Sequence, residues 1–192
     1  MKIFKILPII IVAVMANMAS AQGLGPDKGA MLPHDLSLMA TSGKVENHSS
    51  LTGEKGTAIF FVRSVDWCPF CKKQAMELND RAADFVARGV NPVMISYDTP
   101  EIQKDFSDQN NFTVPLLSDG GSKVIKEFGV LNDSASPDSR LYGYPHPIVF
   151  LVSPDGVIQD KLYVESDTVV NGTSVKDRPE IDTIIAAIDA MD

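Results

Sequence analysis

Two cysteines separated by two residues are the part of this chain most suited to chemistry. They form Cys68-Pro69-Phe70-Cys71, between an apolar run of strand length at 57–63 and an amphipathic segment at 69–88. The first cysteine then lies at a helix N-terminus, where free N–H groups and the helix dipole favour an anion. We therefore expect the pKa of the Cys68 thiol to lie below the ordinary value of about 8.5.

Cys71 follows one helical turn later on the same side of the helix, so its sulfur can reach that of Cys68. We expect Cys71 to be the more buried thiol and to act second. Cys68 would attack a disulfide or another oxidised sulfur, and Cys71 would resolve the mixed intermediate by closing the Cys68–Cys71 disulfide. Pro69 suits the first helical position, because an N–H there would have no partner within the helix and proline has no N–H.

Other uses of the two cysteines have less support. A zinc site needs four ligands, and only three histidines accompany the cysteines, at spacings unlike those of a zinc finger. Haem attachment needs a histidine directly after the second cysteine, where this chain has Lys72. Two buried cysteines without chemistry remain an alternative, because free cysteine is often fully buried. We predict no metal and no cofactor.

The apolar pattern around the dithiol predicts an α/β fold. Buried strands are expected at 57–63, 92–97 and 148–152, and a tight turn at 153–156 leads to a returning strand at 157–164. Helices are expected at 69–88, from 98 onward and at 122–128. This order predicts a mixed central sheet, parallel in its first part with an antiparallel hairpin at the end, and helices on both faces.

The last predicted element is a helix with an apolar face. Asp177 and Glu180 have the spacing of a capping box around Pro179. The face expected to be buried consists of Ile181, Ile184, Ile185 and Ile188.

The chain begins with the pattern of a secretory signal peptide. Lys2 and Lys5 precede an apolar run at 6–14, and Ala19-Ser20-Ala21 supplies small residues for cleavage. We expect removal of 1–21 and export, which in a Gram-negative cell means the oxidising periplasm. An uncleaved N-terminal anchor is the alternative. For residues 22–56 we expect an N-terminal extension of irregular structure with a short hairpin. A domain over 57–192 follows it.

The charge balance excludes some partners. The chain has 17 basic and 25 acidic residues, a formal charge of −8, and it shows no basic stripe. Nucleic-acid binding and adhesion to anionic lipid both depend on clustered basic residues. We therefore expect no nucleic-acid partner and, after cleavage of the leader, no membrane association.

Four segments resemble a known family. FFVRSVDWCPFCKKQ, ISYDTPE, TVPLLSD and PHPIVFLVSPDG are similar, in this order, to segments of redoxin-type proteins of the AhpC/TSA peroxiredoxin-like group in the thioredoxin superfamily. The resemblance covers about residues 55–165. It implies a thioredoxin-like fold, with Cys68 as nucleophile and Cys71 as resolving thiol.

The resemblance also implies a substrate-binding surface around the dithiol. A cis-proline faces the dithiol in that fold, and Pro147 matches its position. His146 would then lie near Cys68, although a loop histidine without a role is the alternative. The residues expected to contact substrate are Trp67, Pro69, Phe70, His146 and Pro147.

Two activities are compatible with the resemblance. Peroxiredoxins carry Thr or Ser three residues before the peroxidatic cysteine, and an Arg that polarises the peroxide. This chain has Val65 and Pro147 at those positions, with Arg63 and Arg140 as candidate substitutes for the Arg. The departure favours disulfide exchange over peroxide reduction.

We therefore expect an exported thiol–disulfide oxidoreductase that acts on disulfide-bearing proteins and uses a thiol electron donor. The alternative is a peroxiredoxin-like thiol peroxidase, an antioxidant enzyme with Cys68 peroxidatic and Cys71 resolving. A third class is a binding protein without enzymatic activity that uses the 132–145 loop.

Overall fold

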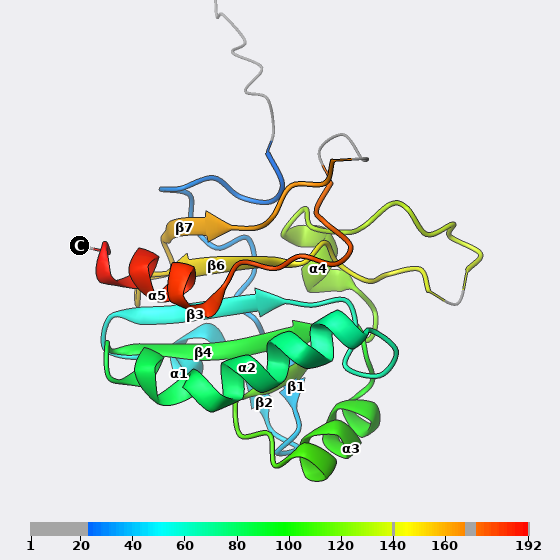
Figure 1. Ribbon diagram of the computed structural model, residues 1–192, viewed down its shortest axis with the longest axis horizontal. Coiled ribbons are helices and arrows are strands. Elements are labelled where there is room, and N and C mark those ends of the chain that lie inside the picture. Colours follow the sequence, from blue (N-terminus) through cyan, green and yellow to red (C-terminus); the bar gives the residue numbers. More distant parts are fainter. Residues whose placement is uncertain (1–22, 140, 168–171, 192) are drawn as a thin grey trace, which may run out of the picture.

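The computed structural model describes residues 23–139, 141–167 and 172–191, so the predicted leader at 1–21 lies outside the described residues. Within them, seven strands form one sheet in the order β2-β1-β5-β4-β3-β6-β7 (Figure 1). The strands are β1 (Leu38–Ala40), β2 (Val45–Glu46), β3 (Gly56–Phe61), β4 (Val90–Ser96), β5 (Leu116–Ser118), β6 (Ile148–Val152) and β7 (Ile158–Leu162). The sheet is mixed, as the sequence predicts.

Strand β3 is the central strand that leads to the dithiol. All six of its residues are buried. It pairs in parallel with β4 and antiparallel with β6, and β6 pairs antiparallel with β7 as the predicted hairpin. A strand covered on both faces needs apolar side chains in both directions, which explains its unbroken apolar sequence.

Helices cover both faces of the sheet, as expected. They are α1 (His48–Leu51), α2 (Pro69–Val86), α3 (Pro100–Asn110), α4 (Lys123–Glu127) and α5 (Ile181–Asp189). Helices α2 and α5 pack on one face, and α1 and α4 pack on the other (Figure 1). The four isoleucines predicted to form the apolar face of the last helix are buried in α5.

The segment before β3 contributes to the same sheet. Strands β1 and β2 form the short antiparallel hairpin expected within 22–56, and β1 also pairs with β5. Leu36, Ala40 and Leu51 are buried in the cluster that covers the α4 face. The extension therefore packs as part of the core that the residues after 57 form.

The predicted capping box at the last helix is wrong. Helix α5 begins at Ile181, and its N-cap residue, Glu180, makes no capping hydrogen bond through its side chain. The Asp177 carboxylate instead accepts a hydrogen bond from Ser174 Oγ (2.8 Å). Asp177 therefore bonds to a nearer donor, within a turn that precedes the helix, instead of capping the helix.

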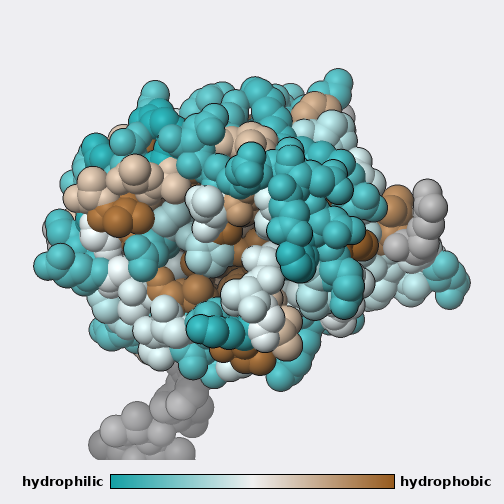
Figure 2. Space-filling view, turned by 90° about the horizontal axis from the view of Figure 1, so that it is seen from below, coloured by the Kyte–Doolittle hydropathy of each residue, from teal (hydrophilic) through white to brown (hydrophobic). Residues whose placement is uncertain are grey.

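The lower face of the molecule is mostly hydrophilic, with small separate hydrophobic patches (Figure 2). Among the described residues, no helix is both long enough and apolar enough to cross a membrane.

We predict that Gly56, the first residue of β3, cannot be replaced by alanine without a large loss of stability. Its φ is +137°, and a Cβ there would lie 1.9 Å from the Val152 carbonyl oxygen. Gly43 is a matched control, because its φ is +78° and no atom lies within 4 Å of the added Cβ. Urea denaturation should show that Gly43→Ala costs about 1 kcal/mol. Gly56→Ala should cost about 3 kcal/mol or more. Equal losses would contradict the argument.

Candidate active site

The loop that connects β3 to α2 is held by a buried carboxylate. Asp98 follows β4, and its carboxylate accepts hydrogen bonds from Ser64 Oγ (2.7 Å), Val65 N (2.8 Å) and Ser96 Oγ (2.7 Å). Burial raises the pKa of Asp98, while its hydrogen bonds to Ser64 and Ser96 act in the opposite direction. Because β3 and β4 are parallel, both end at the same edge of the sheet, and Asp98 joins them there.

Cys68 begins the helix, as the sequence predicts. It is the N-cap residue of α2, Pro69 occupies the first turn, and the backbone N–H of Cys71 donates to Cys68 Sγ (3.3 Å). A guanidinium also lies at this sulfur, since Arg63 Nη2 donates to Cys68 Sγ (3.4 Å). The first cysteine therefore has two donors suited to a thiolate.

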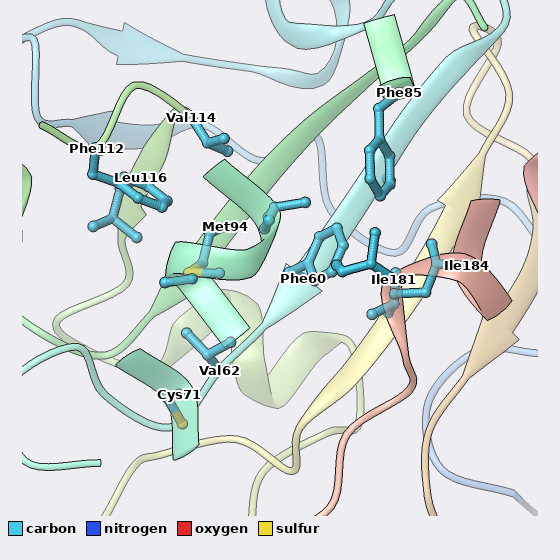
Figure 3. Packing of buried hydrophobic residues seen from close by; sticks show 14 of the residues in the cluster. Phe60, Val62, Cys71, Phe85, Met94, Phe112, Val114, Leu116, Ile181 and Ile184 are labelled. Atoms are coloured by element: carbon cyan, nitrogen blue, oxygen red, sulfur yellow. The ribbon is translucent and has the colours of Figure 1, made fainter. Parts of the chain in front are cut away.

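Cys71 has a guanidinium of its own. Arg178 Nη2, from the segment before α5, donates to Cys71 Sγ (3.6 Å). Cys71 belongs to the hydrophobic cluster between the sheet and α2, and Figure 3 shows it together with Val62, Phe60 and Met94 of that cluster. Each sulfur of the pair thus contacts a different arginine.

Both thiols are fully buried, and Cys71 is the more deeply enclosed of the two, as the sequence predicts. Cys68 and Cys71 each have 0% of their surface exposed. The segment 172–179, here called the strap, contributes to this burial, because Arg63 Nη2 donates to its Val175 carbonyl (2.9 Å) and its Arg178 reaches Cys71.

The two thiols share a proton, and its position differs from the expectation. The hydrogen bond from the Cys68 thiol lowers the pKa of Cys71 to about 5, with further lowering by Arg178. The same bond, followed by burial, raises the pKa of Cys68, against the effect of Arg63. The pair therefore loses its first proton easily and its second reluctantly, because a second ionisation would place two anions in contact.

Aromatic side chains surround the dithiol loop. Trp67 Nε1 donates to Tyr97 OH (2.9 Å), and the Trp67 ring packs edge-on against Tyr144 at 5.6 Å between centroids. The Arg63 guanidinium lies 5.5 Å from the centre of the Trp67 ring. Trp67 and Phe70 are half-buried and Pro69 is exposed. A role of these three residues in substrate binding stays a prediction.

The structure differs from the expectation for Pro147 and His146. The chain has no cis peptide bond among its described residues, so the bond before Pro147 is trans. Just before β6, Pro145 forms an antiparallel bridge with Leu131, and the His146 N–H donates to the Val130 carbonyl (2.7 Å). The His146 ring contacts Asn132 and Thr173, and none of its hydrogen bonds is to a cysteine. Substrate contact by either residue stays a prediction.

Arginines, rather than the lysines beside the motif, provide the positive charge. Lys72 and Lys73 are exposed, and Lys73 pairs with Glu77 (3.2 Å). The sequence named Arg63 as a candidate, and Arg140 lies outside the described residues. Arg178 is 107 positions from Cys71, and no local pattern marks it. Within the described residues, no group of three or more His, Cys, Asp or Glu could hold a metal ion.

Comparisons with known proteins show which family this chain is similar to. The AhpC/TSA family matches residues 29–161. Peroxiredoxin Bcp of Escherichia coli is 28% identical over 136 residues, which are 71% of this chain and 85% of that protein. The chloroplastic peroxiredoxin Q of Sedum lineare is 31% identical over 128 residues, 66% of this chain and 64% of that protein.

A solved structure extends the likeness of the fold beyond the matched segment. The crystal structure of peroxidoxin BcpB from Mycobacterium tuberculosis has a TM-score of 0.71 and 23% sequence identity. The match covers 88% of this chain and 99% of that chain. The thioredoxin-like fold expected from the sequence is thereby confirmed.

We predict that His146 makes part of the stability of the fold dependent on pH. Burial lowers the pKa of His146, so below an unfolded-state pKa of about 6.5 the unfolded chain binds a proton that the folded chain resists. Stability should therefore fall as the pH drops through this range. His146→Gln should lose less stability than the unmodified protein between pH 7 and 5, measured by urea denaturation. Burial also lowers the pKa of His48. Because His48 is present in both proteins, its effect on stability cancels in the comparison. Parallel pH profiles would contradict the assignment.

Proposed function

We propose that this chain, which belongs to the AhpC/TSA family, is a thiol peroxidase that uses Cys68 and Cys71 in a two-thiol cycle. The observation that carries the proposal is a buried pair of sulfurs in contact, each within hydrogen-bond distance of a guanidinium. The names of the relatives, peroxiredoxin Bcp and peroxiredoxin Q, support the same activity. They favour it over the disulfide exchange that the sequence alone suggests.

The shared proton allows either sulfur to be the anion. Transfer of the Cys68 proton along its hydrogen bond to Cys71 leaves a Cys68 thiolate beside Arg63. That thiolate attacks one peroxide oxygen, the O–O bond breaks, and the departing alkoxide or hydroxide takes up a proton. Cys68 becomes a sulfenic acid. Cys71 then attacks its sulfur, the disulfide forms and water leaves, and a thiol donor restores the pair.

Arg63 supplies a hydrogen-bond donor beside Cys68, whereas Val65 has no hydroxyl that could bind a peroxide oxygen. Val65 is buried, and the neighbouring Ser64 hydroxyl is already bonded to Asp98. Arg63, which contacts Cys68, keeps a buried Nε without a partner among the described residues. This donor beside Cys68 suits an oxygen of a hydroperoxide, since buried polar groups normally find a partner.

Disulfide exchange is the second candidate, and the spacing of the cysteines favours it. A nucleophilic thiol at a helix N-terminus with a second thiol one turn later can accept electrons from, or return them to, another dithiol. Under this alternative, the substrate is a disulfide-bearing protein instead of a peroxide.

We predict that the reduced protein consumes hydrogen peroxide or an alkyl hydroperoxide faster than it reduces insulin disulfides. Cys68→Ser should lower peroxide consumption about a hundredfold or more, because it removes the attacking sulfur. Cys71→Ser should still react once, and should stop as a sulfenic acid on Cys68 that dimedone traps.

The chain has only two cysteines, so each signal in these variants belongs to a known thiol. Rapid insulin reduction without peroxide consumption would contradict the peroxidase proposal and favour exchange. Full activity of both variants would exclude a cysteine mechanism altogether.

We also propose that the protein is exported, on the basis of its first 21 residues. Expression of the full chain in a Gram-negative host should yield a periplasmic protein that begins at Gln22, as measured by cell fractionation and intact mass. A protein of full mass in the membrane fraction would instead support an uncleaved anchor.

A further inference from the structure

The strap brings a second arginine to the dithiol from outside the segment that matches the family. The family match ends at residue 161, and the strap spans 172–179. The strap is held at the sulfurs through the Arg63–Val175 and Arg178–Cys71 contacts, and Thr173 contacts His146 (3.1 Å). It then leads into α5, whose isoleucines fix it to the core.

A hollow of about 290 Å³ separates the strap from the first turns of α2. Phe70, Gln74 and Arg178 line it, together with the charged residues Lys73, Glu77, Lys176, Asp177 and Glu180. Gln74 is 4% exposed, and its Oε1 has no partner in the described part of the chain. The hollow is therefore lined by polar groups, among them the Arg178 side chain that contacts Cys71.

Arg178 is the charged side chain that hydrogen-bonds Cys71 Sγ. Arg63 instead contacts Cys68, and Lys73 and Glu77 on α2 pair with each other. An anion on Cys71 lies within a hydrophobic cluster, where a charge is unfavourable unless an opposite charge is in contact with it. Arg178 meets that requirement.

We propose that Arg178 is a catalytic residue for the resolving step, in which its guanidinium holds Cys71 as the attacking thiolate. This proposal rests on the proposed peroxidase function. In that step the Cys71 thiolate attacks the sulfur of the Cys68 sulfenic acid, the S–S bond forms and the S–O bond breaks. The leaving hydroxide takes up one proton and departs as water. Arg178 stays protonated, and its ion pair with the Cys71 thiolate is lost when the disulfide forms.

The first experiment measures Cys71 alone and does not require peroxidase activity. In the Cys68→Ser variant of the full chain, the rate of alkylation by iodoacetamide is followed as a function of pH. Arg178→Gln should move the midpoint of this rate profile to higher pH and slow alkylation near neutral pH about tenfold. Arg178→Lys should recover part of the loss. Arg178→Met is the second neutral variant, for use if Arg178→Gln does not fold.

Arg88→Gln is the matched control, because Arg88 pairs with Asp189 of α5 (2.7 Å) at the other end of α2. It breaks an ion pair to the C-terminal element but leaves the sulfurs untouched, so its alkylation midpoint should not move. An unchanged midpoint with faster alkylation in Arg178→Gln would show that Arg178 only covers the thiol, and would overturn the proposal. An equal shift in Arg88→Gln would overturn it as well.

The second experiment follows the resolving step after one equivalent of hydrogen peroxide. With both cysteines present, Arg178→Gln should form sulfenic acid within about twofold of the normal rate, and should form the disulfide about tenfold more slowly. Dimedone labelling of Cys68 should rise accordingly. If Arg178→Gln closes the disulfide at the normal rate, the proposal fails. If the unmodified protein forms no sulfenic acid, the peroxidase function fails. The pH midpoint of Cys71 alkylation then decides by itself whether Arg178 stabilises the Cys71 thiolate.

Discussion

The site depends on one negative charge in the interior, which two sulfurs share. Cys68 and Cys71 have no exposed surface, and a buried thiolate is unfavourable unless cations and donors surround it. Arg63 provides a cation on one side and Arg178 on the other. The dependence is mutual, because Arg63 is 91% buried and a buried cation also needs an anion. Formation of the Cys68–Cys71 disulfide removes that anion, so oxidation weakens the contacts that both arginines make.

The two sides of the dithiol are held by different kinds of contact. The loop after β3 has three hydrogen bonds to the Asp98 carboxylate, and Trp67 adds a bond to Tyr97. The strap is held by the two arginine contacts, one of which depends on the charge of Cys71. It is also held by the Ser174 N–H, which donates to the Val164 carbonyl (2.7 Å), and by the contact of Thr173 with His146. The Arg178–Cys71 contact weakens when the charge on Cys71 is lost, whereas the bonds to Asp98 do not involve the sulfurs.

Local sequence patterns predict the elements that are long or buried, and they fail where a contact is distant. The apolar run before the dithiol, the CxxC at the helix start and the β6–β7 hairpin all follow from neighbouring residues. Strand β5 has three residues, too few for a period, and is defined by pairing with β1 and β4. Arg178 and the trans bond before Pro147 depend on tertiary packing. The proton on Cys68 depends on the hydrogen bond to Cys71 and on burial, and the motif by itself shows neither.

The choice between peroxide and disulfide as substrate depends on what holds the oxidant at Cys68. The sequence argues against a peroxide because Val65 has no hydroxyl, which assumes that a hydroxyl is needed. Arg63, at 3.4 Å from Cys68 Sγ, is a charged donor in contact with the reacting sulfur, and within the described part of the chain its Nε has no partner. A disulfide-bearing protein, by contrast, must bring a bulky chain to sulfurs with no exposed surface, whereas a small hydroperoxide needs only a narrow opening. Burial and charge therefore both favour the smaller oxidant.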